Sequence, residues 1–288
     1  MAALKKIGNI FLHLLWVGLL TLLTQVGGLV WLLALLVARP LRRRWPLRRF
    51  TTGLVFVALY LLATTLVVPP LARQWGRVPL PVFDPLLRPE SRWFCLLNRH
   101  YVRPGLRQAL EEVAAQLQDR YPGTAVWYMD ANFPFIDGYP LEPHFSHKDG
   151  RKIDLSVYWT LARTGQPFAG NPSPFGYGAF AAPLPGERDY AAECEKKGYW
   201  YIGLDGDLAA PFFQEKNYVF DAGRTAELAR LLAEHPAIGK ILLQPHLSTR
   251  LGLSHYRKIR FQGCKAARHD DHLHAELRSS ADEGHGQP

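Results

Sequence analysis

Cysteine is scarce in this sequence, and the few cysteines lack the spacing of a metal site. Cys95, Cys194 and Cys264 are the only three among 288 residues, and no two of them form the close pairs that bind zinc through thiolates. A thiolate metal centre is therefore excluded. In an oxidising compartment three cysteines allow one disulfide. Cys194–Cys264 is the pairing to test first, and the sequence leaves the connectivity open.

The larger, C-terminal part of the chain also lacks an excess of positive charge. The whole chain carries a formal net charge of +9. Residues 1–103 hold 14 basic and 2 acidic side chains, which leaves 20 basic and 23 acidic ones in the rest. Nucleic-acid-binding domains are usually basic, so we exclude nucleic acid as a partner. The basic residues instead belong to a segment that a membrane surface attracts.

Two long apolar runs occupy the N-terminal quarter. Residues 7–38 are almost unbroken in apolar character and residues 50–70 form a second run. Each is long enough to cross a hydrocarbon core about 30 Å thick. The first run is too long for a cleavable signal peptide and has no small-residue cleavage site, which excludes that interpretation. We expect a membrane anchor in residues 1–70, built as a transmembrane helical hairpin.

The loop between the two runs is rich in arginine. Positively charged loops stay cytoplasmic, so a hairpin in the bacterial inner membrane places its ends and the C-terminal domain in the periplasm or outside the cell. At about 1.5 Å per residue the first run exceeds one membrane thickness. The run is tilted, extends past the membrane, or breaks at Gly27-Gly28 into two crossings. In the case of two crossings the N-terminus is cytoplasmic, and the C-terminal domain still lies outside the cytoplasm. The six arginines are Arg39, Arg42, Arg43, Arg44, Arg48 and Arg49.

Three further regions follow the anchor. Residues 71–100 are broken by prolines and predict a linker that packs on the domain or the membrane. Residues 101–278 predict one domain, and residues 279–288 a polar, disordered tail. Within the domain, residues 165–215 are dense in glycine, proline and aromatics such as Phe175, Tyr177, Tyr199, Trp200 and Tyr201, which is typical of an irregular insertion.

The rest of the domain combines helical and strand patterns. Helical spacing of apolar residues predicts helices over Pro104–Tyr121 and Thr225–Glu234. Residues 125–129 and 240–244 are typical of strands. We therefore expect an α+β fold built on an antiparallel sheet.

Five of the 11 histidines lie in two short segments, each beside an alternating strand. Residues two apart on a strand share a face, so His272, His274 and Glu276 lie opposite the apolar residues of a strand over 271–277. The same alternation over residues 152–159 turns Asp154 away from the core. If these strands are neighbours in one sheet, Asp154 and His274 converge.

His147 precedes the first strand and can fold back as a third ligand. Two imidazoles and a carboxylate suit Zn²⁺, and three protein ligands leave a fourth position for water. Zinc lowers the pKa of such a water towards about 7, which favours hydrolysis at neutral pH. His272 and His269 are then candidates for proton transfer, and His144 lies nearby, three residues before His147.

Other interpretations of the histidines remain. Any single one is typical of a surface or satisfied core residue, and only the grouping favours a metal site. The His269-Asp270 doublet also occurs in metal-dependent phosphohydrolases, but there it lies on helices, whereas here it leads into an alternating strand. His246, after Gln244-Pro245, is a further histidine that can approach the site.

These segments resemble the motifs of the LAS zinc peptidase superfamily, which groups lysostaphin, D-Ala-D-Ala peptidases and sonic hedgehog. The penicillin-insensitive murein endopeptidases match best. Their Ser-His-x-x-Gly segment ending in Asp corresponds to residues 146–154, and their His-Asp-Asp-His-x-His segment to residues 269–274. His144 falls where that family has an additional histidine. The resemblance covers roughly residues 100–278.

The resemblance implies an LAS-type fold in which His147, Asp154 and His274 bind Zn²⁺. It assigns proton transfer and transition-state stabilisation to His272 and His269, without deciding which of the two is the base. The implied activity is that of a zinc metallopeptidase that hydrolyses the peptide cross-links of peptidoglycan.

Two alternatives differ from that activity. D,D-carboxypeptidases of the superfamily use a Glu-x-x-His arrangement, and this sequence has Asp271 three residues before His274, so a carboxypeptidase fits less well. The murein endopeptidases are soluble proteins with several disulfides, and the anchor and few cysteines of this chain leave the substrate open. A non-catalytic membrane-anchored zinc-binding domain that recruits or regulates cell-wall proteins is the other alternative. The presence of His269 and His272, which zinc binding alone does not need, argues against it.

Overall fold

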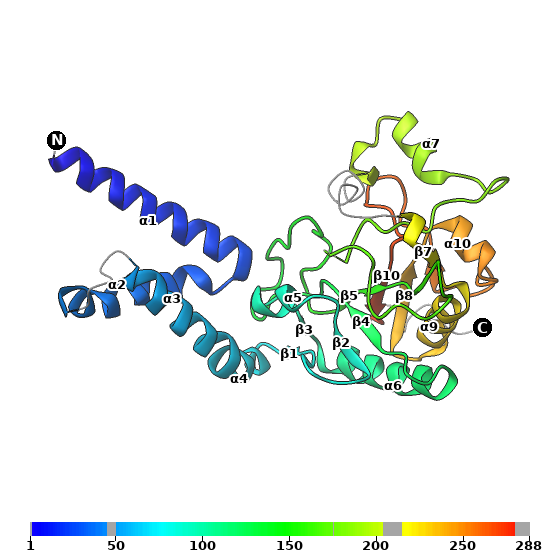
Figure 1. Cartoon of the computed structure of the whole chain (residues 1–288), viewed down its shortest axis with the longest axis horizontal. Helices are drawn as coiled ribbons and strands as arrows, with labels where there is room; N and C mark the ends of the chain where they lie inside the picture. Colours follow the sequence, from blue (N-terminus) through cyan, green and yellow to red (C-terminus); the bar gives the residue numbers. More distant parts are fainter. Residues whose placement is uncertain (1, 45–49, 175, 204–214, 280–288) are drawn as a thin grey trace.

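The computed structural model describes residues 2–44, 50–174, 176–203 and 215–279. It shows a mixed α+β protein in which apolar helices at the N-terminal end precede a sheet-containing domain (Figure 1). The expected α+β class is confirmed. The last nine residues of the tail that was predicted to be disordered lie outside the described part.

The first apolar run consists of two helices. α1 spans Ala2–Thr24 and α2 spans Gly27–Arg44. Gln25, between them, has a φ of 66°, the left-handed conformation that commonly ends a helix. Gly28 lets α2 pack back against α1, because a Cβ atom there would lie 2.0 Å from the Thr21 hydroxyl oxygen. Of the three alternatives for the run over residues 7–38, the structure shows the break next to Gly27-Gly28.

The second apolar run is one continuous helical rod. It is formed by α3 (Thr51–Leu62), the π-helical turn η1 (Ala63–Val67) and α4 (Val68–Gln74). Pro69 and Pro70 have no backbone N–H to donate, so carbonyls one turn earlier lose their usual partners and the helix widens there.

Among the described residues, two helices are long and apolar enough to cross a membrane. They span Leu4–Thr24 and Thr51–Gln74, and Gly27–Leu41 is a shorter apolar helix. Few of their side chains are buried inside the protein. Their length and exposed apolar surface fit an association with the membrane.

The central sheet has the strand order β2-β4-β5-β10-β8-β9. The inner pairs β4–β5, β5–β10 and β10–β8 are antiparallel, as expected, but the outer pairs β2–β4 and β8–β9 are parallel. Parallel pairs need a crossover connection, which the segments with α6 and α10 provide. The expected antiparallel arrangement therefore holds for the inner strands, and the two outer strands depart from it. The strands are β2 Leu87–Pro89, β4 Val126–Tyr128, β5 Lys152–Ser156, β8 Ile238–Leu242, β9 Ile259–Arg260 and β10 His272–Leu277.

Two helices pack against the sheet and against each other. α6 (Pro104–Arg120) matches the predicted helix. α9 (Ala222–Glu234) begins three residues before the predicted start, because the Asp221 carboxylate accepts the Arg224 N–H at 2.9 Å and caps it. The apolar side chains of the two central strands join these helices in the main core, which includes Ile153, Leu155, Leu273 and Ala275. The opposite face of β5 and β10 is left for polar side chains.

Residues 71–100, expected as a linker that packs on the domain or the membrane, pack on the domain and contribute strands to it. Within this segment β1 (Val78–Pro79) pairs with β3 (Tyr101–Val102), and α5 (Arg92–Leu96) follows the edge strand β2. Leu80 and Leu87 are each 1% exposed and lie in the main core. The prolines that predicted a linker are tolerated because they lie in short strands at sheet edges and between elements.

The strand predicted over residues 152–159 ends at Ser156. The chain then enters a second, two-stranded sheet formed by β6 (Trp159–Leu161) and β7 (Tyr218–Phe220). The short turn η4 (Glu215–Asn217) precedes β7, and α10 (Pro245–Arg250) follows β8. The change of sheet therefore interrupts an alternating pattern that looked continuous in the sequence.

The predicted insertion over residues 165–215 has little regular structure in its described part. It contains α7 (Tyr190–Lys196) and the turn η2 (Trp200–Gly203), while residues 175 and 204–214 lie outside the described part. A disulfide joins Cys194 of α7 to Cys264, in the loop before β10. This is the pairing expected from the sequence.

Hydrogen bonds dock the apolar helices on the domain. The Gln25 side chain, in the turn between α1 and α2, accepts the Phe135 N–H at 2.9 Å. The Tyr139 hydroxyl donates to the Thr21 carbonyl at 2.6 Å. Phe135 and Tyr139 belong to the loop that leads into β5, so the end of the helical pair contacts the same loop that carries His144 and His147.

Candidate metal centre

β5 and β10 bring two of the predicted ligands together. The strands are antiparallel neighbours with His274 directly opposite Asp154, a position in which Cβ atoms lie about 4.5–5.5 Å apart. His274 Nδ1 lies 2.9 Å from Asp154 Oδ1. Both residues are buried, on the strand faces that the alternation predicted.

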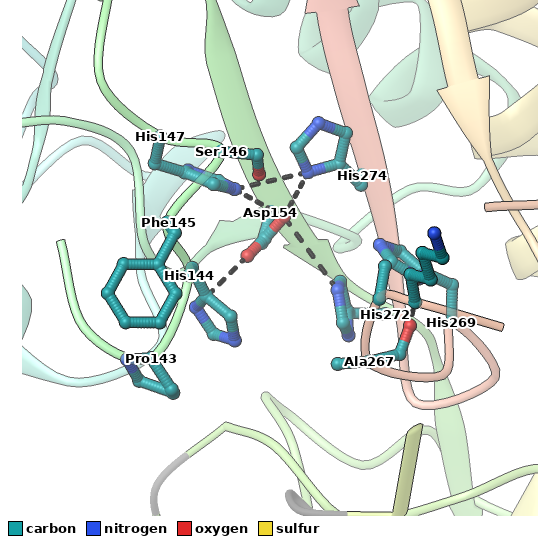
Figure 2. Close-up of a pocket in the computed structure, with 12 residues that line it drawn as sticks. Pro143, His144, Phe145, Ser146, His147, Asp154, Ala267, His269, His272 and His274 are labelled. Atoms are coloured by element: carbon teal, nitrogen blue, oxygen red, sulfur yellow. Dashed lines mark hydrogen bonds and ion pairs between the residues drawn. The ribbon is translucent and has the colours of Figure 1, made fainter. Parts of the chain in front are cut away.

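His147 reaches the same point from the loop before β5 (Figure 2). Its Nε2 atom lies 3.1 Å from His274 Nδ1 and 3.2 Å from Asp154 Oδ1. Its Nδ1 atom lies 2.8 Å from the carbonyl oxygen of Ala131. A carbonyl only accepts, so Nδ1 carries a proton, and Nε2 is the ring atom that faces the other two residues.

These three residues can hold a metal ion. Their ligand atoms all lie within 4.8 Å of one another, and all three side chains are buried. Bonds of about 2.0–2.2 Å place tetrahedral ligand atoms roughly 3.3–3.6 Å apart, so small outward movements open the cluster to an ion. The hydrogen bond from His147 to a backbone carbonyl also fits, because metal-binding histidines usually donate their other ring N–H in this way.

The electrostatics of the cluster favour the forms that bind metals. Burial by itself raises the pKa of a carboxyl group, but the charges of His147 and His272 and two hydrogen bonds outweigh it and hold the pKa of Asp154 well below its usual range. Burial lowers the pKa of His274 to about 4, against the opposing effect of Asp154. Metal ligands must be deprotonated, and a carboxylate and a neutral imidazole meet that requirement.

His272 borders the centre beside a carboxylate. Its Nδ1 atom lies 2.5 Å from Asp271 Oδ1, and its Nε2 atom lies 3.7 Å from Asp154 Oδ1. Burial lowers the pKa of His272, but the nearby charges of Asp271 and Asp154 outweigh burial and raise it to about 9. Asp271 also accepts the Gly178 N–H at 2.6 Å. The carboxylate therefore fixes the orientation of the His272 ring.

His269 lies on the other side of His272. The two ring centroids are 4.5 Å apart, and the ring of His269 lies 5.7 Å from that of His274. Its Nδ1–H donates to the Ala267 carbonyl at 2.8 Å. Burial, followed by the positive charge of His272, holds the pKa of His269 well below its usual range. The centre thus sits beside one histidine with a raised pKa and one with a lowered pKa.

A network of buried hydrogen bonds holds the second carboxylate oxygen of Asp154, Oδ2. The Tyr177 hydroxyl donates to Asp154 Oδ2 at 2.9 Å and accepts the Asp130 N–H at 3.2 Å. His144 Nδ1 lies 3.0 Å from Asp130 Oδ2 and 3.5 Å from Asp154 Oδ2. Arg99 in turn donates to Asp130 at 2.7 Å. His144 therefore lies next to the centre, as expected, and contacts the ligand carboxylate.

Sequence reasoning missed Tyr177 and Asp130 as site residues. Tyr177 stood out only as one of several aromatics in the insertion, and Asp130, directly after the strand expected over residues 125–129, was not singled out. Burial, followed by the charges of Asp130 and Asp154, raises the pKa of Tyr177 well above its usual value, which keeps its hydroxyl a donor. The other notable aromatics differ: Trp200 is 72% exposed, and Phe175 lies outside the described residues.

A cavity of about 330 Å³ opens over the centre. One wall is the loop from Pro143 to His147, and the other includes Lys265, Ala266 and Ala267. The disulfide at Cys264 holds this second wall. Phe145, on the first wall, is 54% exposed, and Lys265 is also exposed, so both an apolar surface and a positive charge are presented to a ligand.

His246 does not take part in the site. It is buried, and its Nε2 atom lies 2.9 Å from the Ala181 carbonyl oxygen, away from the residues that line the cavity. The sequence around His246 did not show whether its side chain would approach the site or lie apart from it.

The sequence matches no known protein-family model, and no curated protein matches it.

Proposed function

We propose that this protein is a membrane-anchored zinc metallopeptidase that hydrolyses peptide cross-links of peptidoglycan. The observation that carries the proposal is the convergence of His147, Asp154 and His274 at the floor of a cavity that also holds His269 and His272. Three ligands with one open position are typical of catalytic zinc sites, whereas structural sites use four protein ligands.

The donor set supports zinc as the metal. Two imidazoles and one carboxylate, all buried and without a thiolate, suit zinc better than calcium or magnesium, which prefer oxygen ligands. His147, Asp154 and His274 would hold the zinc ion, and the chemistry that it would supply is an acidified water as nucleophile and polarisation of the carbonyl group to be attacked. The same arrangement of motifs in the sequence resembles the murein endopeptidases of the LAS superfamily, and that resemblance is the basis for proposing their activity and fold.

The neighbouring histidines have the placement that peptide hydrolysis needs. His272, oriented by Asp271, and His269 lie on the cavity side of the ligands. We assign to these two residues the transfer of a proton to the leaving amine and the stabilisation of the negative charge that develops on the attacked carbonyl oxygen. His144 and Tyr177 hold Asp154 in place.

The cavity walls suit a short, acidic peptide. Lys265 offers a positive charge close to the centre, and the stem peptides of peptidoglycan carry carboxylates. Phe145 and Pro143 offer apolar contact on the opposite wall. These features support a peptidoglycan peptide as the substrate.

Charge and disulfide support a periplasmic domain on an inner-membrane anchor. The start of α1, with Lys5 and Lys6, and the end of α2, after Arg39, both lie on the side away from the domain (Figure 1). Positive charge marks the cytoplasmic side of a membrane protein. The Cys194–Cys264 disulfide fits an oxidising compartment on the other side.

The full-length protein in detergent micelles, incubated with cross-linked and uncross-linked muropeptides with and without a chelator, tests the proposal. Mass spectrometry should find chelator-sensitive conversion of cross-linked dimers to monomers. Loss of a terminal alanine instead would identify a carboxypeptidase. Absence of any product from zinc-loaded, folded protein would refute the peptidase and favour a binding role.

Two histidine variants separate metal binding from catalysis. His274→Ala should abolish stoichiometric zinc binding, measured by elemental analysis of the purified protein. His272→Ala should leave zinc bound and reduce turnover by about 10²–10⁴-fold, the contribution typical of a positioned proton-transfer group. Full activity of the His272→Ala protein would contradict the assignment.

A further inference from the structure

A second, larger cavity lies where the apolar helices meet the domain. Its volume is about 840 Å³, within the range of about 300–1,000 Å³ that is typical of small-molecule sites. None of its lining residues lines the cavity over the metal centre. One side is formed by Leu61, Thr64, Thr65 and Pro69 of the second apolar rod, and the other by residues between Pro79 and His100. The site belongs to neither part alone.

The position of this cavity is that of a membrane boundary. Leu61 lies at the middle of the membrane-spanning candidate Thr51–Gln74, and Pro69 lies in its C-terminal half, next to the domain. Phe83 and Trp93, which also line the cavity, are 81% and 66% exposed. Exposed aromatic side chains of this kind concentrate at the interface between membrane and water.

The walls are mostly apolar, with a cation among the exposed lining residues. Leu80, at 1% exposed, and Leu96 lie among the less exposed residues of the wall. Arg92 is exposed and places its guanidinium 5.3 Å from the Phe83 ring centroid. An apolar interior with a positive charge near the surface matches an amphiphile with an anionic head.

Two buried polar atoms of titratable side chains in the lining have no hydrogen-bond partner among the described residues. They are Nδ1 of His100, a residue only 5% exposed, and Oε2 of Glu90. Glu90 Oε1 accepts the Asn171 N–H at 2.6 Å, so only one of its oxygens is satisfied. Buried polar atoms are normally paired. These two atoms therefore indicate that a ligand with polar groups is accommodated beside the apolar walls.

We propose that this cavity binds an anionic membrane phospholipid, with one acyl chain between the helical rod and the domain and the phosphate at Arg92. His100 and Glu90 face the ester region of the lipid. Burial raises the pKa of Glu90 to about 7, so its carboxyl group can carry a proton and donate to an ester carbonyl. The inference requires that the apolar helices lie in a membrane, and it is independent of the peptidase activity.

Photo-crosslinking of the full-length protein tests this site. The protein is reconstituted in phosphatidylcholine vesicles that contain phosphatidylglycerol with a diazirine in one acyl chain, and labelled residues are identified by mass spectrometry. Leu61→Trp fills the cavity, and Leu62→Trp is the matched control, because Leu62 is a similarly exposed leucine of the same helix that does not line the cavity. Labels are expected on the cavity wall, including the segment from Pro79 to Leu96.

Leu61→Trp should reduce labelling of the cavity wall by about tenfold, the loss of affinity expected when about two methylene groups of the acyl chain are no longer buried. Leu62→Trp should leave this labelling unchanged. Arg92→Gln should reduce the preference for the phosphatidylglycerol probe over a phosphatidylcholine probe with the same diazirine chain. Thr65→Phe provides a second filling variant should Leu61→Trp fail to fold. Labels confined to the exposed faces of α1 and α3, and unchanged by filling, would show only surrounding lipid and overturn the site. A complete absence of labels would overturn the membrane placement on which it rests.

Discussion

Removal of one hydroxyl group behind the metal centre should weaken metal binding without disturbing the fold. Tyr177→Phe deletes the donor that Asp154 Oδ2 accepts at 2.9 Å, in a buried site. A hydrogen bond to a charged group contributes about 1.5–3 kcal/mol, which corresponds to roughly 10–150-fold in an equilibrium constant. Partners behind a metal ligand typically change metal affinity by about 10–100-fold. We expect the zinc dissociation constant to rise within that range.

Competition with a fluorescent zinc chelator measures this affinity on the purified full-length protein. Tyr158→Phe is the matched control, because Tyr158 is also a buried tyrosine whose hydroxyl donates to a carbonyl, that of Ala125 at 2.8 Å, away from the metal centre. This control should lower thermal stability and leave zinc affinity unchanged. Equal zinc affinity of Tyr177→Phe and the unmodified protein would refute the argument that Tyr177 positions Asp154.

Three further predictions concern stability and catalysis. Burial raises the pKa of Glu90 from 4.5 to about 7, so the folded state binds this proton more tightly and its stability falls as the pH rises from about 4.5 to about 7. Glu90→Gln should remove this pH dependence and raise the free energy of unfolding at pH 8 by up to about 3 kcal/mol. Denaturant unfolding in micelles measures this difference. Equal stability of the two proteins at pH 8 would contradict the prediction. The Cys194–Cys264 bridge spans 70 residues, so Cys264→Ser should lower the free energy of unfolding by about 4 kcal/mol in the same assay. A reductant should lower the free energy of unfolding of the unmodified protein to the same value. No change with either the substitution or the reductant would show that the bridge does not form. Asp271→Asn should keep zinc bound and reduce muropeptide turnover by about 10²–10⁴-fold, an expectation that unchanged turnover would contradict.

The metal cluster was accessible from the sequence because strand alternation carries three-dimensional information. Two residues that face away from the core on paired strands lie side by side when the register places them opposite each other. Asp154 and His274 are directly opposite each other in the pairing of β5 with β10. His147 followed from its distance along the chain to the first strand. Tyr177 was not accessible, because it reaches Asp154 from an insertion with no periodic pattern, and its contact depends entirely on tertiary packing.

The errors in the predicted fold have a common physical cause. Proline content suggested a linker over residues 71–100, but short edge strands tolerate proline, and Leu87 is buried by the sheet and helices that close over it. Alternation over residues 152–159 concealed the change of sheet after Ser156. In both regions the local sequence pattern reflected the local conformation, but pairing with distant strands determined which sheet the residues joined. The break between α1 and α2 was one of three alternatives, and the close packing at Gly28 accounts for it.

The loop that carries His147 connects the metal centre to the membrane helices. Its Phe135 N–H donates to Gln25 in the turn after α1, and its Tyr139 hydroxyl donates to the Thr21 carbonyl in α1. Its Asp137 carboxylate pairs with Arg77, just after α4, and with Arg103 at 3.0 Å. A domain on a free linker would sample a range of heights above a membrane. These contacts instead hold the loop at both membrane-spanning candidates, so one ligand of the centre is fixed relative to the helices. Within the proposed function, the enzyme then acts at one height above the bilayer, and the part of the cell wall that it can reach is the part that comes to the membrane.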